Sequence, residues 1–254
     1  MTEVDGAAGE ILAWDSAFWG MRIGRALGER LTPERARQLR SWCHREQVRC
    51  LYFLADPDDW DTVPAAASIG LSPVDVRVTF ERTVEGTPGE YPVRRAHTAQ
   101  PVVALRPHEP SDVAVLEEIA ATSYTDSRFF FDRRFPRPGC RQLYETWIRR
   151  SCEGWADSVL VAARGAEPVG FISCHLDDGG RTGRIGLLGV SERARGMGVG
   201  SLLVDGALDW FGSQTTRTVS VVTQGRNVAA QRLYQRSGFL TGEMRLWYHG
   251  WYPE

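Results

Sequence analysis

The first 84 residues alternate compact apolar runs with segments of helical spacing. Residues 33–47 repeat their apolar positions every three to four residues, as an amphipathic helix does, and Thr32 is placed to cap it. The predicted elements are a strand over residues 11–15, a helix over 33–47, a strand over Cys50–Ala55, a helix over 59–69 and a strand over 74–80. This β-α-β-α-β order indicates layered α/β structure.

The second half of the chain has the same kind of pattern over a longer stretch. Strands are predicted over residues 102–106, 159–163, 169–175, 184–190, 218–223 and 239–248. Helices are predicted over residues 112–123, 140–152, 198–212 and Val228–Arg236, with 124–139 as an aromatic, arginine-rich loop. Residues 85–101 are rich in Pro, Gly and charge, which predicts a linker. We therefore expect three parts: a smaller domain over 1–84, the linker over 85–101 and a larger domain over 102–254.

Composition narrows the function classes. The formal net charge of -2 argues against a general nucleic-acid binder. The sequence contains no lysine, so no Lys can act as a phosphate clamp, a Schiff base or a general base. No basic start precedes an apolar run and no stretch approaches ~20 apolar residues, so we expect no signal peptide, no membrane span and a cytoplasmic location. Five scattered cysteines fit free thiols, and their spacing predicts no metal site.

A strand, a glycine-rich turn and a helix follow one another between residues 184 and 212. The turn reads R-x-x-G-x-G, with Arg195, Gly198 and Gly200 in the fixed positions. Such a turn presents unpaired backbone N–H groups and the positive end of a helix dipole to an anion. A Walker loop is excluded because it requires lysine, and Leu203 stands where a dinucleotide loop has its third glycine. The alternative is a turn that only starts a helix.

A second motif, N-x-x-A-x-x-L-Y-x-x-x-G-F, runs from Asn227 to Phe239. Asn227 is a good helix cap, and Tyr234 lies two turns further along the same helix. A phenol has a reference pKa of ~10, above the ~8.5 of a thiol, so it can protonate a departing thiolate. Taken alone, Tyr234 fits a core aromatic on a helix better than a catalytic residue.

Together the two motifs resemble the GNAT superfamily of N-acetyltransferases. The resemblance implies an α/β GNAT fold, in which a mixed central sheet is flanked by helices, with acetyl-CoA as the cosubstrate. It implies that Tyr234 is catalytic and protonates the CoA thiolate, while a strand splay offers an N–H to the thioester carbonyl. The cofactor-binding residues expected from it are Leu188, Gly189, Val190, Arg195, Gly196, Met197, Gly198, Val199, Gly200 and Asn227.

A wider resemblance, to the TDP-fucosamine N-acetyltransferases, covers most of the chain. It is carried by AWDSAFWG, CLYFLAD and VDVRVTFER, by SYTDSRFFFD and LYETWIRRS, and by RIGLLGV through LYQRSGF. It implies a reduced GNAT-like half over residues 1–84 and acetylation of the C4 amine of a TDP-4-amino-4,6-dideoxy sugar. The stretch FFFDRRFPRPG departs from the family pattern, which leaves the particular sugar open.

The loop after residue 123 contains the expected acceptor site. Its substrate-binding candidates are Tyr124, Ser127, Arg128 and Phe129: aromatic rings stack a base or sugar, and arginine clamps a diphosphate. The alternative is that the phenylalanines only anchor the loop on the core. For the general base, His175, Asp177, Asp178 and a water chain all stay open.

Two rival functions remain. One is acetylation of another amine, such as a peptide N-terminus, an antibiotic or a free amino sugar. The other is a non-catalytic acyl-CoA sensor, which intact Arg195, Asn227 and Tyr234 disfavour. The aromatic end, residues 247–252, predicts either an edge strand of a homodimer or a cap on its own core.

Overall fold

The structure is a computed structural model of the 254-residue chain, and it describes residues 8–84, 95–96 and 103–253. Two compact units make up the chain. Unit 1 comprises Met1–Arg77, Gln224–Arg226 and Met244–Glu254, and unit 2 comprises Val78–Thr223 and Asn227–Glu243. The long strands β4 (Leu71–Thr83) and β11 (Leu240–Trp251) therefore contribute residues to both units. The division at residues 84 and 102 remains a prediction from the sequence.

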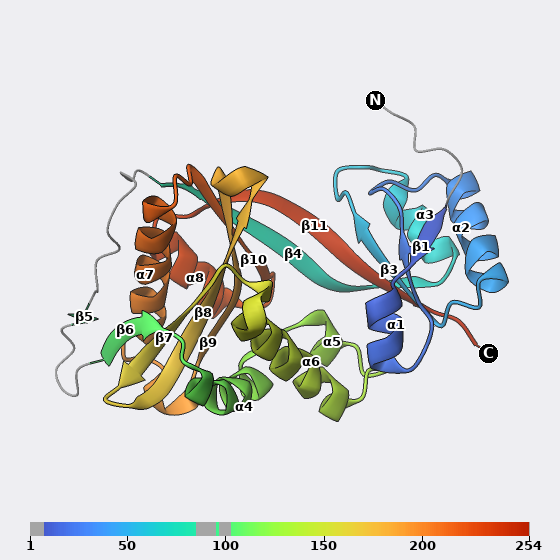
Figure 1. Cartoon of the computed structure of the whole chain (residues 1–254). Coiled ribbons are helices and arrows are strands. Elements are labelled where there is room, and N and C mark those ends of the chain that lie inside the picture. The colour runs from blue at the N-terminus through green and yellow to red at the C-terminus, as the bar shows by residue number, and fades with distance from the viewer. Residues whose placement is uncertain (1–7, 85–94, 97–102, 254) are drawn as a thin grey trace. The chain divides into compact units, whose positions relative to one another are not determined.

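Unit 1 is a small α/β layer structure (Figure 1). Besides parts of β4 and β11, its elements are β1 (Gly9–Ile11), α1 (Ala13–Trp19), β2 (Ile23–Ala26), α2 (Pro33–Arg45), β3 (Cys50–Ala55) and α3 (Thr62–Ser68). Strand β2 runs parallel to β3, whereas β1 is antiparallel to β2. The fully buried Leu39 and Phe53 belong to the hydrophobic core of this unit.

The predicted strand over Cys50–Ala55 and the capped helix are confirmed, since the Thr32 hydroxyl accepts the Arg35 N–H at 3.2 Å. The strand predicted over residues 11–15 is wrong, because a helix begins at Ala13. The Ser16 hydroxyl explains the turn: it donates to the Leu12 carbonyl at 2.7 Å and accepts the N–H of Ile23, the first residue of β2, at 2.9 Å. The helix predicted over residues 59–69 is shorter, starting at Thr62.

The aromatic C-terminal segment lies inside its own sheet. Residues Leu246 to Trp251 of β11 pair antiparallel with Ala55 to Cys50 of β3. Tyr248 is 3% exposed and packs in the core of unit 1. Because the backbone of these residues is paired within the chain, the option of a free edge strand that joins a partner subunit is wrong for them.

Unit 2 is a mixed sheet with helices on both faces (Figure 1). Besides parts of β4 and β11, its elements are β5 (Arg95–Ala96), β6 (Val103–Pro107), α4 (Val113–Ser123), α5 (Arg128–Phe131), α6 (Arg137–Arg150), β7 (Ser158–Arg164), β8 (Glu167–Asp177), β9 (Thr182–Val190), α7 (Val199–Ser213), β10 (Thr218–Gln224) and α8 (Val228–Arg236). Its strands follow the order β4-β10-β9-β8-β7-β6-β5. The pairs from β5 to β9 are antiparallel, but β9 and β10 are parallel, as a mixed sheet requires.

One expectation for unit 2 needs correction. Residues 124–139 are not a continuous loop, because α5 interrupts them and α6 already begins at Arg137. Pro138 favours this early start, since proline fits the first turn of a helix. Within the predicted linker over residues 85–101, Arg95–Ala96 form a short strand that pairs antiparallel with β6. The other residues of the linker lie outside the described residues.

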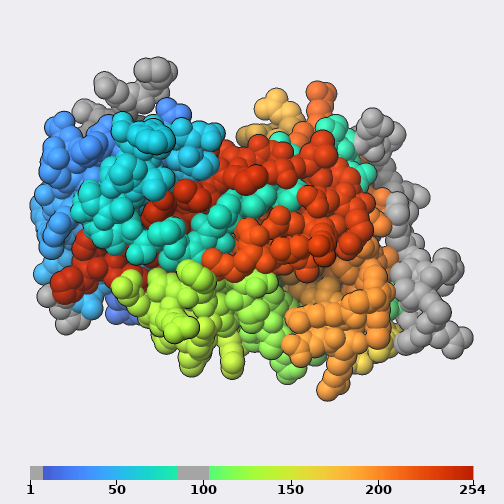
Figure 2. Space-filling view, turned by 180° about the vertical axis from the view of Figure 1, so that it is seen from behind, coloured from blue at the N-terminus to red at the C-terminus, as the bar shows by residue number. Residues whose placement is uncertain are grey.

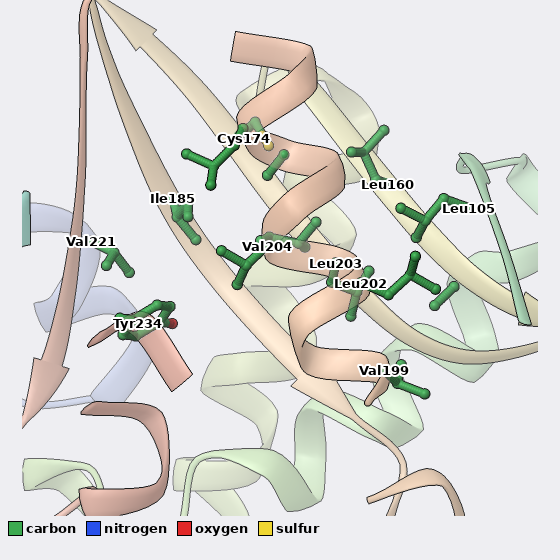
Figure 3. Packing of buried hydrophobic residues seen from close by; sticks show 14 of the residues in the cluster. Leu105, Leu160, Cys174, Ile185, Val199, Leu202, Leu203, Val204, Val221 and Tyr234 are labelled. Atoms are coloured by element: carbon green, nitrogen blue, oxygen red, sulfur yellow. The ribbon is translucent and has the colours of Figure 1, made fainter. Parts of the chain in front are cut away.

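Helix α7 covers one face of the unit 2 sheet. Leu203, Val204 and Phe211 are fully buried in a core shared with Ile185 and Val221 of the strands (Figure 3). The C-terminal residues, coloured red in Figure 2, reach the surface that this view shows. Leu240, the first residue of β11, is 77% exposed. Among the described residues no helix is long and apolar enough to cross a membrane.

Candidate active site

Strands β9 and β10 separate partway along their length. Their parallel pairing extends from Thr182 opposite Thr218 to Ile185 opposite Val221. Beyond Ile185, β9 continues to Val190 and stays paired with β8 alone. Figure 3 shows the strand with Ile185 and the strand with Val221 diverging. The backbone of Leu188 therefore lies on a stretch of β9 that has one neighbouring strand, which is the splay expected from the sequence.

A β-bulge precedes Leu188. The pairing register of β8 and β9 shifts between Ile172 and Cys174. The residue between them, Ser173, is fully buried, and its hydroxyl accepts the Leu187 N–H at 2.8 Å. Bulges of this kind redirect the backbone that follows them. Sequence reasoning missed Ser173, because a single serine in an apolar strand carries no pattern that reveals its partner.

The glycine-rich turn connects β9 to α7. Gly196 and Gly198 have φ values of 76° and 80°, a left-handed conformation that glycine adopts without steric cost. A Cβ atom at either position would meet nothing within 4 Å, so the backbone here is open to a ligand. Helix α7 starts at Val199, and the N–H groups of its first turn have no intrahelical acceptor. The turn can thus hold an anion.

Arg195 is held beside this turn. Its guanidinium donates to the Val190 carbonyl at 3.3 Å and lies 3.6 Å from the Glu192 carboxylate. The side chain is 49% exposed, so the remaining guanidinium N–H groups can reach a phosphate. Met197, predicted in the same set, is 48% exposed and accepts a contact from Arg164 at 3.4 Å.

Helix α8 brings the second motif to the same region. The Asn227 side chain caps the helix by accepting the Ala230 N–H at 3.0 Å, as predicted. Helices α7 and α8 lie close together, since a Cβ atom on Gly200 would be only 3.2 Å from Leu233. The glycine turn and Asn227 therefore belong to adjacent helices.

Tyr234 lies between the diverging strands (Figure 3). It is 5% exposed, and its ring packs against Phe80 and Phe239 at centroid distances of 6.1 and 5.8 Å. Burial raises the pKa of Tyr234 far above its ordinary value, because the charged phenolate loses solvation. The phenol is therefore neutral at physiological pH and can act as a proton donor.

The four acceptor candidates separate into two pairs. Tyr124 stacks on Tyr144 at 4.3 Å, and the hydroxyls of Tyr124 and Ser127 are buried without a hydrogen-bond partner among the described residues. Phe129, by contrast, is 4% exposed and contacts other aromatic rings, while the Arg128 guanidinium lies over its ring at 4.2 Å. Phe129 thus anchors α5, and Tyr124 and Ser127 offer unused polar groups.

Two of the candidate bases, Asp177 and Asp178, lie far from Leu188, whereas the His175 ring lies against Gly186, two residues before it. Asp177 pairs with Thr182, so at roughly 3.3 Å per residue it lies about 20 Å along β9 from Leu188. Asp178 adjoins it in the same turn and accepts from the Thr182 hydroxyl at 3.3 Å. His175 is buried, and desolvation together with Arg184 lowers its pKa. Among the described residues no cluster of His, Cys, Asp and Glu could hold a metal ion.

Comparison with known proteins places these features in context. Residues 116–239 match the model of the Acetyltransferase (GNAT) family. The dTDP-fucosamine acetyltransferase of Escherichia coli O6:H1 is 27% identical over 235 residues, which cover 90% of this chain and 92% of that protein. SpsD of Bacillus subtilis, a spore coat polysaccharide biosynthesis protein, is 30% identical over 59% of this chain and 52% of its own. The chain thus spans about half the length of SpsD.

A further curated relative and two solved structures are also similar to this chain. The mycothiol acetyltransferase of Mycolicibacterium paratuberculosis is 31% identical over 69% of this chain and 56% of its own. Among solved structures, a GCN5-related N-acetyltransferase from Sphaerobacter thermophilus covers 96% of this chain and 76% of its own, with a TM-score of 0.64 at 15% identity. A tandem GNAT protein from the clavulanic acid pathway covers 91% and 76%, with a TM-score of 0.56 at 14% identity. At such identities these structures support the fold alone.

Proposed function

We propose that this chain, whose residues 116–239 match the Acetyltransferase (GNAT) family, uses acetyl-CoA to acetylate the primary amine of a nucleotide-linked amino sugar of the TDP-4-amino-4,6-dideoxyhexose type. The observation that carries the proposal is the buried phenol of Tyr234 between β9 and β10, on helix α8, which lies beside helix α7 with its N-terminal glycine turn. The similarity to the fucosamine enzyme over 90% of the chain supports the acceptor class. We propose that the reaction takes place in the cytoplasm, because a reducing compartment keeps cysteines free, as they are in this structure.

The glycine turn and Asn227 form the proposed acetyl-CoA site. The N–H groups from Gly196 to Gly200 hold the pyrophosphate, with the Arg195 guanidinium beside them. Leu188, Gly189 and Val190 line the thioester arm with backbone groups of the unpaired β9 edge. Met197 and Val199 complete the turn. Asn227 keeps its side-chain NH2 for the pantetheine arm, because only its carbonyl oxygen is used in the cap.

The reaction needs an oxyanion donor and an acid. The Leu188 N–H stabilises the negative charge on the carbonyl oxygen as the amine nitrogen bonds to the carbonyl carbon. When the C–S bond breaks, Tyr234 donates its proton to the thiolate. The amine loses a proton to water in the same cycle, so transfer is direct and needs no covalent acyl-enzyme. The cysteines fit this route, since desolvation raises the pKa of buried Cys140 and of half-buried Cys152 to about 11, which keeps both thiols protonated.

The acceptor lies at Tyr124 and Ser127, with Arg128 as the cation that meets the diphosphate. The unused hydroxyls of Tyr124 and Ser127 favour a polar ligand with several hydrogen-bonding groups, as a sugar has. Phe129 contributes by fixing α5 rather than by stacking on the base.

A panel of amines tests this function. CoA release is measured with acetyl-CoA and TDP-4-amino-4,6-dideoxy sugars, free amino sugars, aminoglycosides or peptides. Saturable turnover restricted to TDP-amino sugars is expected. Turnover restricted to peptides or free amines, or no turnover although acetyl-CoA binds, would reject the acceptor class.

A second acceptor class is favoured by the relatives named for mycothiol. The one from Mycolicibacterium paratuberculosis is 31% identical over 69% of this chain, against 27% over 90% for the fucosamine enzyme. An acceptor without a nucleotide is therefore the alternative. Turnover with a free amino sugar and none with its TDP-linked form would establish it.

A further inference from the structure

Tyr124 occupies a fixed position at the end of α4. It follows the last residue of the helix, Ser123, and its ring stacks on Tyr144 of α6 with the planes 17° apart. Tyr144 is 5% exposed and is itself held by Trp147 at 5.3 Å. The Tyr124 ring is therefore supported from one side by a buried aromatic cluster, which limits where its hydroxyl can point.

The Tyr124 hydroxyl faces the splayed strand. Its pKa is raised well above the ordinary value, mainly by burial and then by the neighbouring phenols of Tyr234 and Tyr144. The Leu188 N–H faces the phenol oxygen and opposes this rise. That contact does not complete a hydrogen bond of standard geometry, so the hydroxyl has no hydrogen-bond partner in the described part of the chain. Tyr124 thus keeps its proton at neutral pH and has no acceptor for it.

These contacts identify a second donor at the reaction centre. A carbonyl oxygen that accepts the Leu188 N–H lies next to the phenol oxygen, within reach of the unused O–H. We propose that the Tyr124 hydroxyl and the Leu188 N–H together form the oxyanion site for the thioester carbonyl. The inference rests on the proposed acetyl transfer and deepens it, since Tyr124 then acts on the acetyl donor as well as near the acceptor.

The reaction is the same acetyl transfer, but the negative charge on the carbonyl oxygen is stabilised by two hydrogen-bond donors instead of one. As the amine nitrogen bonds to the carbonyl carbon, the C=O electron pair moves onto oxygen, where both donors stabilise it. When the pair returns, the C–S bond breaks and Tyr234 protonates the sulfur. Tyr124 keeps its own proton throughout, because its hydroxyl only donates a hydrogen bond to the carbonyl oxygen, whereas Tyr234 gives its proton to the departing sulfur. A phenol paired with a backbone N–H is thus suited to a donor role.

Infrared spectroscopy of bound acetyl-CoA tests this directly. The carbonyl band is isolated by subtracting spectra recorded with [1-13C]acetyl-CoA from those with the unlabelled compound. A donor removed from the carbonyl raises the stretching frequency. We expect the band to move to higher wavenumber in Tyr124→Phe and to stay in place in Tyr144→Phe, which keeps the stacked ring. An unchanged band in Tyr124→Phe overturns the inference.

Two further measurements test the inference even if Tyr124→Phe does not fold or the proposed acceptor is wrong. Replacement of Tyr124 by 3-fluorotyrosine, a stronger donor, should move the band to lower wavenumber than in the unmodified protein; no movement contradicts the inference. With any amine that turns over, Tyr124→Phe should lower kcat about 10²-fold while the Kd of acetyl-CoA changes little. The infrared result needs no amine, so failure of the proposed acceptor class leaves it intact.

Discussion

The hydroxyl of Ser173 on β8 accepts the backbone N–H of Leu187 on β9 at 2.8 Å. A buried side chain on one strand thereby satisfies the backbone of the bulge on the next, immediately before the residue whose N–H we assign to the oxyanion site. Ser173 is fully buried, so water does not compete for this hydrogen bond.

Ser173→Ala should therefore damage both stability and catalysis. It leaves the Leu187 N–H buried without a partner, which costs about 1–3 kcal/mol in the free energy of unfolding. A looser bulge also misplaces Leu188, so kcat should fall. Urea denaturation and steady-state kinetics measure the two effects. Ser213→Ala, which removes a half-buried hydroxyl bonded to the Trp210 carbonyl, is the control and should change neither by much.

Tyr234→Phe should separate chemistry from binding. Removal of one oxygen keeps the packing on Phe80 and Phe239 but removes the proton donor. We expect kcat to fall by about 10² to 10⁴, with the Kd of acetyl-CoA little changed by calorimetry. A sensor that only binds acyl-CoA would show no turnover in either protein, and unchanged kcat would assign the acid to another group.

Arg195→Gln should weaken acetyl-CoA binding. The guanidinium is oriented by the Val190 carbonyl, and a charge-assisted contact to phosphate is worth about 1.5–3 kcal/mol. We expect KM for acetyl-CoA to rise about tenfold or more at low ionic strength. Arg193→Gln, which removes the same charge from an exposed neighbour, is the matched control. An equal rise in both variants would show that only net charge matters.

His175 should influence the pH dependence of stability rather than catalysis. Its pKa is lowered by burial and by Arg184, while Asp157 and Asp177 oppose the shift. The unfolded chain, with a His pKa near ~6.5, then binds more protons than the native state, so stability falls as pH drops below about 6.5. In His175→Gln this fall should be smaller. Urea midpoints between pH 5 and 7.5 measure it.

Kinetics of the same variant test the base assignment. The His175 ring lies against Gly186, two residues before Leu188, although its backbone pairs with Arg184. If His175 is a structural histidine, His175→Gln should retain most of the wild-type kcat with an unchanged acid limb. Loss of that limb would instead identify His175 as the base.

Local signals in the sequence explain which parts were predictable. Thr32 and Asn227 cap their helices through contacts three residues away, and Cys50–Ala55 is apolar throughout, so each reveals itself within one turn or strand. The left-handed glycine turn has a similarly short pattern. Such short-range patterns are enough to locate the glycine turn and the motif with Tyr234 from the sequence alone.

Features that depend on distant partners were not predictable in this way. The Ser173–Leu187 contact depends on the register of two strands, which one residue of slip would destroy. The stacking of Tyr124 on Tyr144 joins the end of α4 to the middle of α6. Helix α1 has no local signal of this kind, because its turn relies on Ser16 accepting the N–H of Ile23 in β2. Each requires tertiary contacts that a linear pattern does not encode.

Strands β4 and β11 contribute residues to both units, so the chain cannot be divided at one point into two complete units. A fragment beginning at residue 102 would omit Val78–Thr83 and leave the edge of β10 uncovered, inviting self-association. A fragment ending at residue 84 would lack the strand that pairs with β3. Neither fragment contains all the strands of its own sheet. Domain-swapping experiments should therefore transfer the residues of both units together.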